Sequence, residues 1–154
     1  MAALVFPVPD LDRSLREWPG IVLYAATVLL EAEAEPFEGK LAVAWVIRNR
    51  MDARRQGVHD VILARDQFSC WREDYAPMRR ARLVGIHPPA WHDCWRAASG
   101  AFFGDLDDPT DGAQHYLNPT LTRQIRPTHD LPAWYDERRV VARIGGHEFL
   151  RGVA

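Results

Sequence analysis

The stretch from residue 20 to residue 50, GIVLYAATVLLEAEAEPFEGKLAVAWVIRNR, constrains the fold more than any other part of the chain. Two strongly apolar segments flank a short acidic cluster, and a proline breaks the cluster. Glu31 directly follows the apolar run from residue 27 to residue 30, so its nearest neighbours in a helix are aliphatic. Burial disfavours the charged form of a carboxylate and raises its pKa, which suits a general acid. The pattern predicts two core helices with an acid between them.

Composition limits the class of protein. The chain has 154 residues, of which 47% are hydrophobic and 26% charged, which fits one globular domain with a single core. Nineteen basic and twenty-one acidic residues give a formal charge of −2, which argues against strong general attraction to nucleic acid or an anionic membrane. No apolar run reaches the roughly 18 residues of a membrane span. The first ten residues have no basic region, so we expect no secretory signal, and synthesis in the cytoplasm.

The two cysteines, Cys70 and Cys94, are too few for a disulfide scaffold and lack the paired spacing of a zinc site. We expect free, partly buried thiols, with one disulfide as the alternative.

The first half of the chain is predicted to be mainly helical. Residues 1–20 form an N-terminal lead with a short helix from Asp10 to Trp18, and residues 21–154 form the main domain. The core helices run from Ile21 to about Ala34 and from Pro36 to Gly57, because the residue before a proline is biased out of helical geometry. The remaining segments are a short helix over 58–65, an ordered loop over 66–71 and a mixed region over 72–87.

The second half is predicted to mix a helix with strands. A helix covers Ala90 to about Phe103, a short strand covers 113–117, and residues 119–137 form a long irregular connection. The final segments 139–144 and 147–150 flank Gly145-Gly146, which is typical of a β-hairpin.

Carboxylates are the first candidates for chemistry. Glu31 and Glu35 share a face at helical spacing, although Pro36 interrupts the geometry, and Glu38 falls in the first turn of the next helix. A two-carboxylate glycosidase would place a second acid across the scissile bond, and either Glu35 or Asp66 can be proposed for that position. Spacing alone does not choose between them, and an acidic patch at a helix end is often only a solvated cap.

Other candidates are weaker. His87, His92, Asp93 and Cys94 can be drawn as zinc ligands, but His87 and His92 are five residues apart across two prolines and share no helix face. Isolated histidines such as His115 and His147 are most often hydrogen-bonded structural groups. The chain has no Gly-x-Ser-x-Gly nucleophile motif and no phosphate-binding glycine loop. The arginines at 48, 50, 54 and 55 lack a recognition motif for nucleic acid, and those at 79, 80 and 82 form a basic face expected to be solvated.

Several motifs together resemble one family. Glu31-Ala-Glu-Ala-Glu35-Pro36-Phe37-Glu38-Gly39, followed by Ala42-Val43-Ala44 and Val46-Ile47-x-Asn49-Arg50, resembles the opening of the catalytic domain of SleB-type cell wall hydrolases. The later motifs keep the family's order and spacing over about residues 21–150. They are Gln67-Phe68-Ser69, Gly112-Ala113 with His115-Tyr116-x-Asn118-Pro119, Pro132-x-Trp134, and Ile144-Gly145-x-His147-x-Phe149.

The resemblance implies an α+β fold: one helix-rich domain, related to lysozyme-like lytic transglycosylases, with a small antiparallel sheet. Glu31 matches the catalytic glutamate. In such enzymes that residue protonates the glycosidic oxygen between N-acetylmuramic acid and N-acetylglucosamine, then assists attack by the sugar's own 6-hydroxyl. One acid suffices, and no cofactor or metal is implied. The residues implied to line the cleft or contact the glycan are Glu35, Phe68, Ser69, His115, Tyr116, Asn118, Trp134 and His147.

The resemblance also implies partners. The substrate is bacterial peptidoglycan, and a monomer that neither binds nucleic acid nor inserts stably into a membrane is expected. Spore enzymes of the family usually carry an export signal and a separate wall-binding module, and neither is recognisable here. The chain therefore looks more like a phage endolysin that a holin would release to the wall. The segment from Trp71 to Pro89 is longer and more basic than is usual for the family.

Two alternatives remain open at this point. One is a zinc-dependent peptidoglycan amidase or peptidase that uses His87, His92 or Cys94. The other is a non-catalytic protein that binds the wall or serves as part of a particle.

Overall fold

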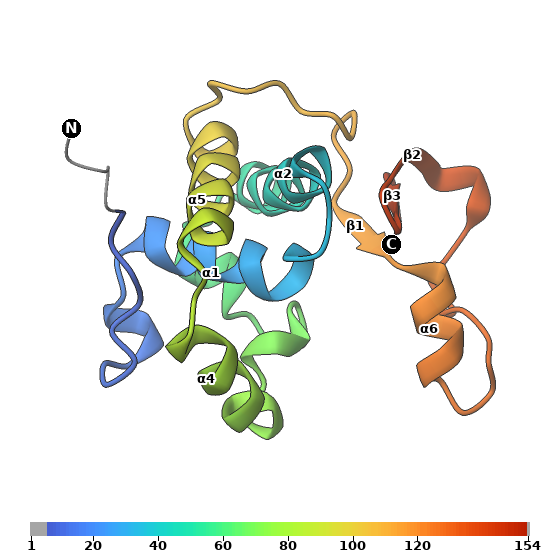
Figure 1. The fold of residues 1–154 in the computed structure, drawn as a ribbon. Coiled ribbons are helices and arrows are strands. Elements are labelled where there is room, and N and C mark those ends of the chain that lie inside the picture. Colours follow the sequence, from blue (N-terminus) through green and yellow to red (C-terminus); the bar gives the residue numbers. More distant parts are fainter. Residues whose placement is uncertain (1–5, 154) are drawn as a thin grey trace.

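Three helices form the centre of the molecule. The structure is a computed structural model that describes residues 6–153 (Figure 1). Helix α1 (Gly20–Ala32) packs on both α2 (Phe37–Arg54) and α5 (Pro88–Phe102). Ten of the thirteen residues of α1 are buried, so this helix has neighbours on nearly every side, as its apolar sequence predicts.

The break between the two predicted core helices is confirmed, although it falls earlier than expected. Helix α1 ends at Ala32 rather than Ala34, and Pro36 is the N-cap of α2 with Glu38 in the first turn. Because the proline restricts the residue before it, the chain leaves helical geometry before Glu35. Glu31 therefore lies in the last turn of α1, whereas Glu35 lies in the junction outside either helix.

Short elements complete the helical side of the molecule. They are η1 (Leu15–Glu17), α3 (Val58–Ile62), η2 (Ser69–Trp71), η3 (Glu73–Tyr75) and α4 (Ala76–Val84). The helices predicted over 10–18 and 58–65 were drawn too long, because only one 3-10 turn and five residues, respectively, are helical. The loop over 66–71 is ordered as predicted and contains η2.

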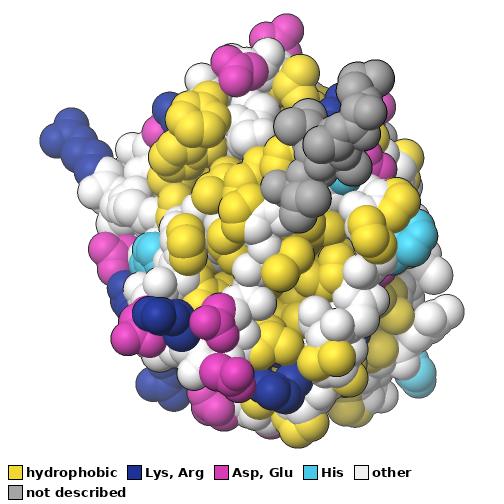
Figure 2. Space-filling model, turned by 60° about the vertical axis from the view of Figure 1, so that its left-hand side comes forward, with side chains coloured by type: hydrophobic (Ala, Val, Ile, Leu, Met, Phe, Trp, Pro, Cys, Tyr) yellow, Lys and Arg dark blue, Asp and Glu magenta, His cyan; other side chains and the backbone are white. Residues whose placement is uncertain are grey.

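The N-terminal lead, as far as it is described, packs on the main core. Residues 1–5 of the predicted lead lie outside the described residues. Trp18 is buried, the Trp91 indole N–H donates to the Pro7 carbonyl at 3.1 Å, and the Phe6 ring stacks on Trp95 with centroids 5.2 Å apart. On the face that includes this segment, apolar side chains are visible between charged groups (Figure 2). Residues 6–20 thus share the hydrophobic core of the rest of the chain.

The basic face predicted for Arg79, Arg80 and Arg82 is only partly solvated. Arg82 donates to the carbonyls of Leu30 at 2.9 Å and Leu29 at 3.1 Å, and Arg79 donates to two carbonyls near η2. These arginines satisfy backbone acceptors that the sequence pattern does not reveal. Arg82 in particular joins α4 to the helix turn that carries Glu31.

A three-stranded antiparallel sheet lies beside α2 (Figure 1). Its strands are β1 (His115–Leu117), β2 (Val140–Ile144) and β3 (His147–Leu150), in the order β1-β3-β2. The predicted hairpin is confirmed: Gly145 and Gly146 join β2 to β3, and Gly145 has a φ of +57°, which favours glycine. Tyr116 pairs with Phe149 across the sheet, so both side chains lie on the same face.

The segment predicted as irregular over 119–137 contains a helix, so that prediction was wrong in part. Helix α6 (Pro119–Ile125) begins after Asn118, whose side-chain oxygen accepts a hydrogen bond from the Leu121 amide at 2.9 Å. A 3-10 turn, η4 (Glu137–Arg139), precedes β2. No residue of α6 is buried, and the helix protrudes from the rest of the molecule (Figure 1).

Both cysteines are buried and free, as predicted. None of the helices in the described part of the chain has the length and apolar character needed to cross a bilayer.

Candidate active site

Glu31 lies in the wall of a cavity of about 660 Å³ that we call the Glu31 cleft. The last turn of α1, the loop before η2, strand β1 and helix α6 contribute its walls. The lining residues are Leu30, Glu31, Arg50, Asp66, Gln67, Phe68, Ser69, His115, Tyr116, Leu117, Asn118, Leu121, Thr122, Ile125, Trp134 and His147.

A smaller groove of about 400 Å³ continues on the other side of Glu31. It shares five residues with the Glu31 cleft, namely Leu30, Glu31, Asn118, Leu121 and His147. The groove extends past Glu33 and Glu35 to Arg82. Glu31 therefore lies where the two spaces meet, and a chain-like ligand that passed through both would cross its carboxylate.

One donor holds the Glu31 carboxylate. The Tyr116 hydroxyl donates to Oε2 at 2.9 Å. Burial, with the nearby Glu31 charge added, raises the pKa of Tyr116 and of Cys70 well above their ordinary values, so both groups stay protonated and neutral. Among the described residues, Glu31 Oε1 accepts no hydrogen bond, so Oε1 is the oxygen available to carry and donate a proton.

Glu35 is not in the Glu31 cleft, unlike the other predicted substrate-contacting residues. Its Oε2 accepts from the Gly146 amide at 3.1 Å, and its Oε1 lies 3.1 Å from His147 Nδ1. A Cβ atom on Gly145 would lie 1.8 Å from Glu35 Oε2. This carboxylate therefore joins the β2–β3 turn to the junction between α1 and α2. Of the two connected spaces, Glu35 borders only the smaller groove. The sequence alone had not decided whether this residue is a second acid or contacts the substrate.

The other predicted residues all lie together in the Glu31 cleft. Phe68 caps η2 and Ser69 is its first residue, and His115 lies near Trp134 with ring centroids 5.5 Å apart. Asn118 also caps α6, and the Tyr116 and His147 rings are 5.3 Å apart. The structure thus brings residues from four separated segments into one space. Their roles in catalysis or binding stay predictions.

The two histidines of the Glu31 cleft have lowered pKa values because they are largely buried. Burial, followed by the charges of Arg50 and Arg54, lowers the pKa of His115. Burial also lowers the pKa of His147, while the nearby Glu35 and Glu31 carboxylates act in the opposite direction. His147 Nδ1 is close to Glu35 in distance but lacks a hydrogen bond of good geometry. Both rings are therefore neutral at neutral pH.

Sequence reasoning did not select Arg50, Leu121 and Ile125 as site residues. Arg50 was considered only with the other arginines of its helix as a possible nucleic-acid contact, although Val46 and Ile47 precede it by four and three positions and lie on the buried face of the same helix. That spacing was the signal that Arg50 points inward. Leu121 and Ile125 are exposed and line the cleft from α6, a helix that the sequence pattern did not reveal.

Unpaired polar atoms gather at this cleft. Among the described residues, three buried side-chain atoms have no hydrogen-bond partner: Arg50 Nη1, His115 Nδ1 and His147 Nδ1. All three belong to residues that line the Glu31 cleft. Buried polar groups in folded proteins are nearly always paired, so such a cluster marks a site whose polarity serves a ligand or a reaction.

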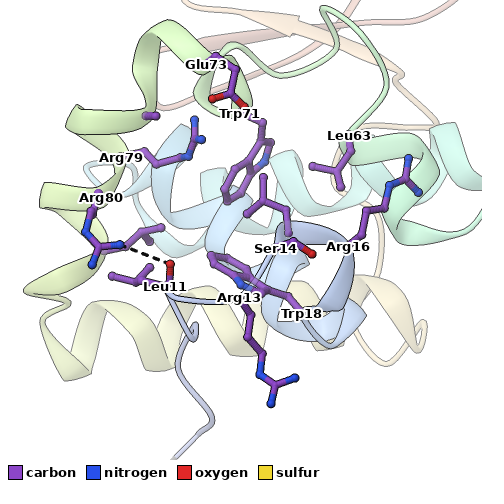
Figure 3. A pocket seen from close by; sticks show the side chains of 13 residues that line it. Leu11, Arg13, Ser14, Arg16, Trp18, Leu63, Trp71, Glu73, Arg79 and Arg80 are labelled. Atoms are coloured by element: carbon purple, nitrogen blue, oxygen red, sulfur yellow. Dashed lines mark hydrogen bonds between the residues drawn. The ribbon is translucent and has the colours of Figure 1, made fainter.

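Figure 3 shows a second hollow, which we call the arginine-rimmed hollow and which Trp71 of η2 helps to line. Its volume is about 560 Å³, and the Trp18, Leu63 and Trp71 side chains form its floor. Its charged groups are Arg13, Arg16, Glu73, Arg79 and Arg80. Three of these arginines already have an aspartate partner. The pairs are Arg13 with Asp10, Arg16 with Asp60, and Arg80 with Asp12. The only carboxylate that lines it, Glu73, is exposed and belongs to the short turn η3.

The predicted alternative zinc ligands do not assemble. His92 packs on the Phe6 ring with centroids 4.9 Å apart, and Cys94 is buried in the core. Within residues 6–153, no three His, Cys, Asp or Glu side chains are grouped so that they could hold a metal ion.

Comparisons with known proteins identify the family and the fold. The catalytic domain of the Bacillus cereus SleB protein is 26% identical, with a TM-score of 0.62 over 94% of this chain and 95% of that one. The catalytic domain of the germination-specific lytic transglycosylase SleB from Bacillus anthracis is 25% identical, with a TM-score of 0.62 over 94% of this chain and 100% of that one. A comparison with curated proteins found no match. The cell wall hydrolase family model matches residues 34–150, which is most of the chain, and the chain therefore belongs to the cell wall hydrolase family.

Proposed function

We propose that this protein is a lytic transglycosylase that cleaves peptidoglycan between N-acetylmuramic acid and N-acetylglucosamine, with Glu31 as its catalytic acid and base. The observation that carries the proposal is that Glu31 lies where the Glu31 cleft and the smaller groove meet, with one carboxylate oxygen held by Tyr116 and the other free. A glycan strand lying through the cleft and the groove would present a glycosidic bond to that free oxygen. The similarity to the Bacillus anthracis transglycosylase domain supports the same reading.

The reaction needs two proton transfers at one carboxyl group. Protonated Glu31 gives its proton to the glycosidic oxygen as the bond to C1 of the muramic acid residue breaks. The resulting carboxylate then accepts the proton of the 6-hydroxyl of the same sugar, whose oxygen bonds to C1. The products are a free 4-hydroxyl on one fragment and a 1,6-anhydro ring on the other, so no water is consumed. The Tyr116 hydroxyl holds Oε2 during both transfers.

The competing function is that of a hydrolase, which would need a second carboxylate at the site. Asp66 lines the Glu31 cleft, but its side chain is 75% exposed and lies 3.6 Å from Arg65. Glu35 is engaged by the β2–β3 turn. A carboxylate that is exposed and already paired gains little from its surroundings as a nucleophile or base. These positions favour the chemistry that uses one acid.

Two measurements test the proposal together. Mass spectrometry of soluble fragments released from purified walls should detect anhydro ends, and Asp66→Asn should leave the rate within about threefold of the unmodified protein, as expected of an exposed residue outside the reaction. Reducing ends, together with a large loss on Asp66→Asn, would replace the transglycosylase with a two-carboxylate hydrolase. Binding to insoluble walls without any soluble product would indicate the non-catalytic alternative.

We also propose that the enzyme serves as a phage-type endolysin. The proposal rests on the motif pattern described above, which resembles that of phage relatives as well as spore enzymes. Production of the chain inside a bacterial host should leave the cells intact, and co-production of a holin should cause rapid lysis. Equal survival with and without the holin would contradict this role while leaving the chemistry untouched.

A further inference from the structure

Arg50 is the most deeply buried charged side chain near the reaction centre. It belongs to α2 and is 6% exposed, yet its guanidinium lines the Glu31 cleft. Nε donates to the Gln114 carbonyl at 2.7 Å, and the guanidinium carbon lies 5.0 Å from the centre of the Phe68 ring. Nη1 has no partner. The side chain is thus fixed by two contacts that do not neutralise its charge.

No carboxylate forms an ion pair with Arg50. Arg48 on the same helix differs in this respect, because it pairs with Asp52 at 3.0 Å. Arg54 has no carboxylate partner either, but it is exposed and donates to the Gln67 side chain at 2.8 Å. In the described chain, no carboxylate oxygen lies within 4.0 Å of the Arg50 guanidinium. A buried charge without compensation costs several kcal/mol, so such a group persists where a nearby opposite charge or a function offsets the cost.

The nearby opposite charge is Glu31. Burial lowers the pKa of Arg50, and among its charged neighbours Glu31 is the carboxylate that acts to raise it again. Tyr116 also contributes in that direction only if it is ionised, and burial keeps it neutral. Electrostatic coupling is mutual, so a cation that Glu31 stabilises is also a cation that stabilises the Glu31 carboxylate.

The other groups that face Glu31 do not supply this charge. Tyr116 from β1 and Cys70 from η2 are neutral. His147 from β3 is kept neutral by burial and borders Glu35. Arg82 from α4 is partly exposed and pairs with Glu33 at 3.1 Å. Arg50 is therefore the buried cation near Glu31 that no other carboxylate neutralises.

We propose that Arg50 is the countercharge of Glu31, which stabilises the carboxylate formed once Glu31 has given its proton to the glycosidic oxygen. The inference rests on the proposed function of Glu31 and adds a residue that acts on the reaction through it. Arg50 does not exchange protons with the substrate. It favours both proton release in the first transfer and the basic form that the second transfer requires.

The pH profile of kcat/KM tests the inference. Removal of a nearby cation makes Glu31 hold its proton more firmly, so the alkaline limb of the profile should move to higher pH. In Arg50→Gln the shift should be about one to two pH units, as a unit charge roughly 6–12 Å away produces at an effective dielectric constant near 20. Arg50→Lys retains the charge and should leave the limb in place. Arg54→Gln, one turn further along the same helix and exposed, is the matched control and should not move it.

The outcomes separate a charge effect from a structural one. A loss of activity that is equal at every pH, with unmoved limbs in Arg50→Gln, would overturn the inference. If Arg50→Gln fails to fold, Arg50→Met, which keeps an apolar stem over Phe68, should show the same shift. If neither folds, a displaced limb in Arg50→Lys would contradict the inference, and an unmoved limb would support it. Full activity of Glu31→Gln would contradict the proposed function as well as this inference. If Glu31→Gln is inactive but the pH profile of kcat/KM is unchanged in Arg50→Gln, only this inference is contradicted.

Discussion

The Glu31 cleft and the arginine-rimmed hollow are close in volume and both are lined in part by η2, but their charges are arranged differently. The arginine-rimmed hollow has more cations, and most of them are paired at the surface with Asp10, Asp12 and Asp60. The cleft has few charged groups, and its buried polar atoms are left without partners. Paired surface ions contribute little free energy to binding or folding. The comparison teaches that unpaired buried groups, and not the number of charges, distinguish the reactive space.

The sharpest test of this comparison exchanges one carboxylate in each hollow. Glu31→Gln should reduce the rate of wall clearing by about 10²- to 10⁴-fold, the usual contribution of a positioned general acid. Glu73→Gln in the arginine-rimmed hollow should change it less than twofold, because Glu73 is exposed and makes no contact with Glu31. Turbidity of purified walls measures both. Clearing by Glu31→Gln at the normal rate would end the assignment of this cleft.

The second test breaks the contact between the hairpin and Glu35. Gly145→Ala places a Cβ where Glu35 Oε2 lies and strains a φ of +57°, so we expect the free energy of unfolding to fall by about 1–3 kcal/mol. Activity should fall more than stability predicts, since His147 follows the turn. A stable variant with normal activity would show that the turn does not position the cleft.

The third test deletes one hydrogen bond next to each hollow. Tyr116→Phe removes the donor to Glu31 Oε2, and we expect kcat to fall about tenfold, which corresponds to a hydrogen bond to a charged group. Trp71→Phe removes the 3.0 Å bond from the indole to the Thr27 hydroxyl and should lower stability by about 1–3 kcal/mol with kcat nearly unchanged. Thermal melts and initial rates separate the two effects. Equal loss of kcat in both variants would contradict the comparison.

The smallest effect concerns pH and stability. Burial, then Arg50 and Arg54, lowers the pKa of His115 below its ordinary 6.5, so the unfolded chain binds this proton more readily than the folded one. The contribution of His115 to stability is complete above pH 6.5 and is lost as the pH falls from 6.5 toward the folded-state value. Thermal melts from pH 8 to pH 5 should show this decline, with a smaller slope in His115→Asn. The exposed His129, changed to Asn, is the control and should leave the slope unaltered.

The sequence predicted those parts of the molecule where a local pattern and the tertiary environment agree. Helix α1 was predictable because an unbroken apolar run can only be buried, and the β2–β3 hairpin because two glycines suit its tight turn. Helix α6 was missed because it is short and exposed: its start signal at Asn118 and Pro119 is followed by only one apolar pair at helical spacing, Leu121 and Ile125.

The site was predicted less evenly than the fold. Glu31 came first from its place after an apolar run, and the family motifs added the aromatic residues that cluster with it in space. Glu35 was placed with the substrate-contacting residues, because no local pattern shows that a turn 110 residues later would occupy its carboxylate. Arg50 was considered only with the other arginines of its helix as a nucleic-acid contact, although its place on the inward helix face indicates a buried position.

The contact between Glu35 and Gly146 also sets the order in which activity can arise. The two residues are 111 positions apart, so α1, α2 and Glu31 leave the ribosome long before the hairpin that completes the cleft. Contacts of such separation form late, because a long loop must close before they are made. We therefore expect a nascent chain to lack wall-degrading activity until residues 140–150 have been synthesised. A chain that carries its acid near the beginning and its last cleft strand near the end is inert while it is being made.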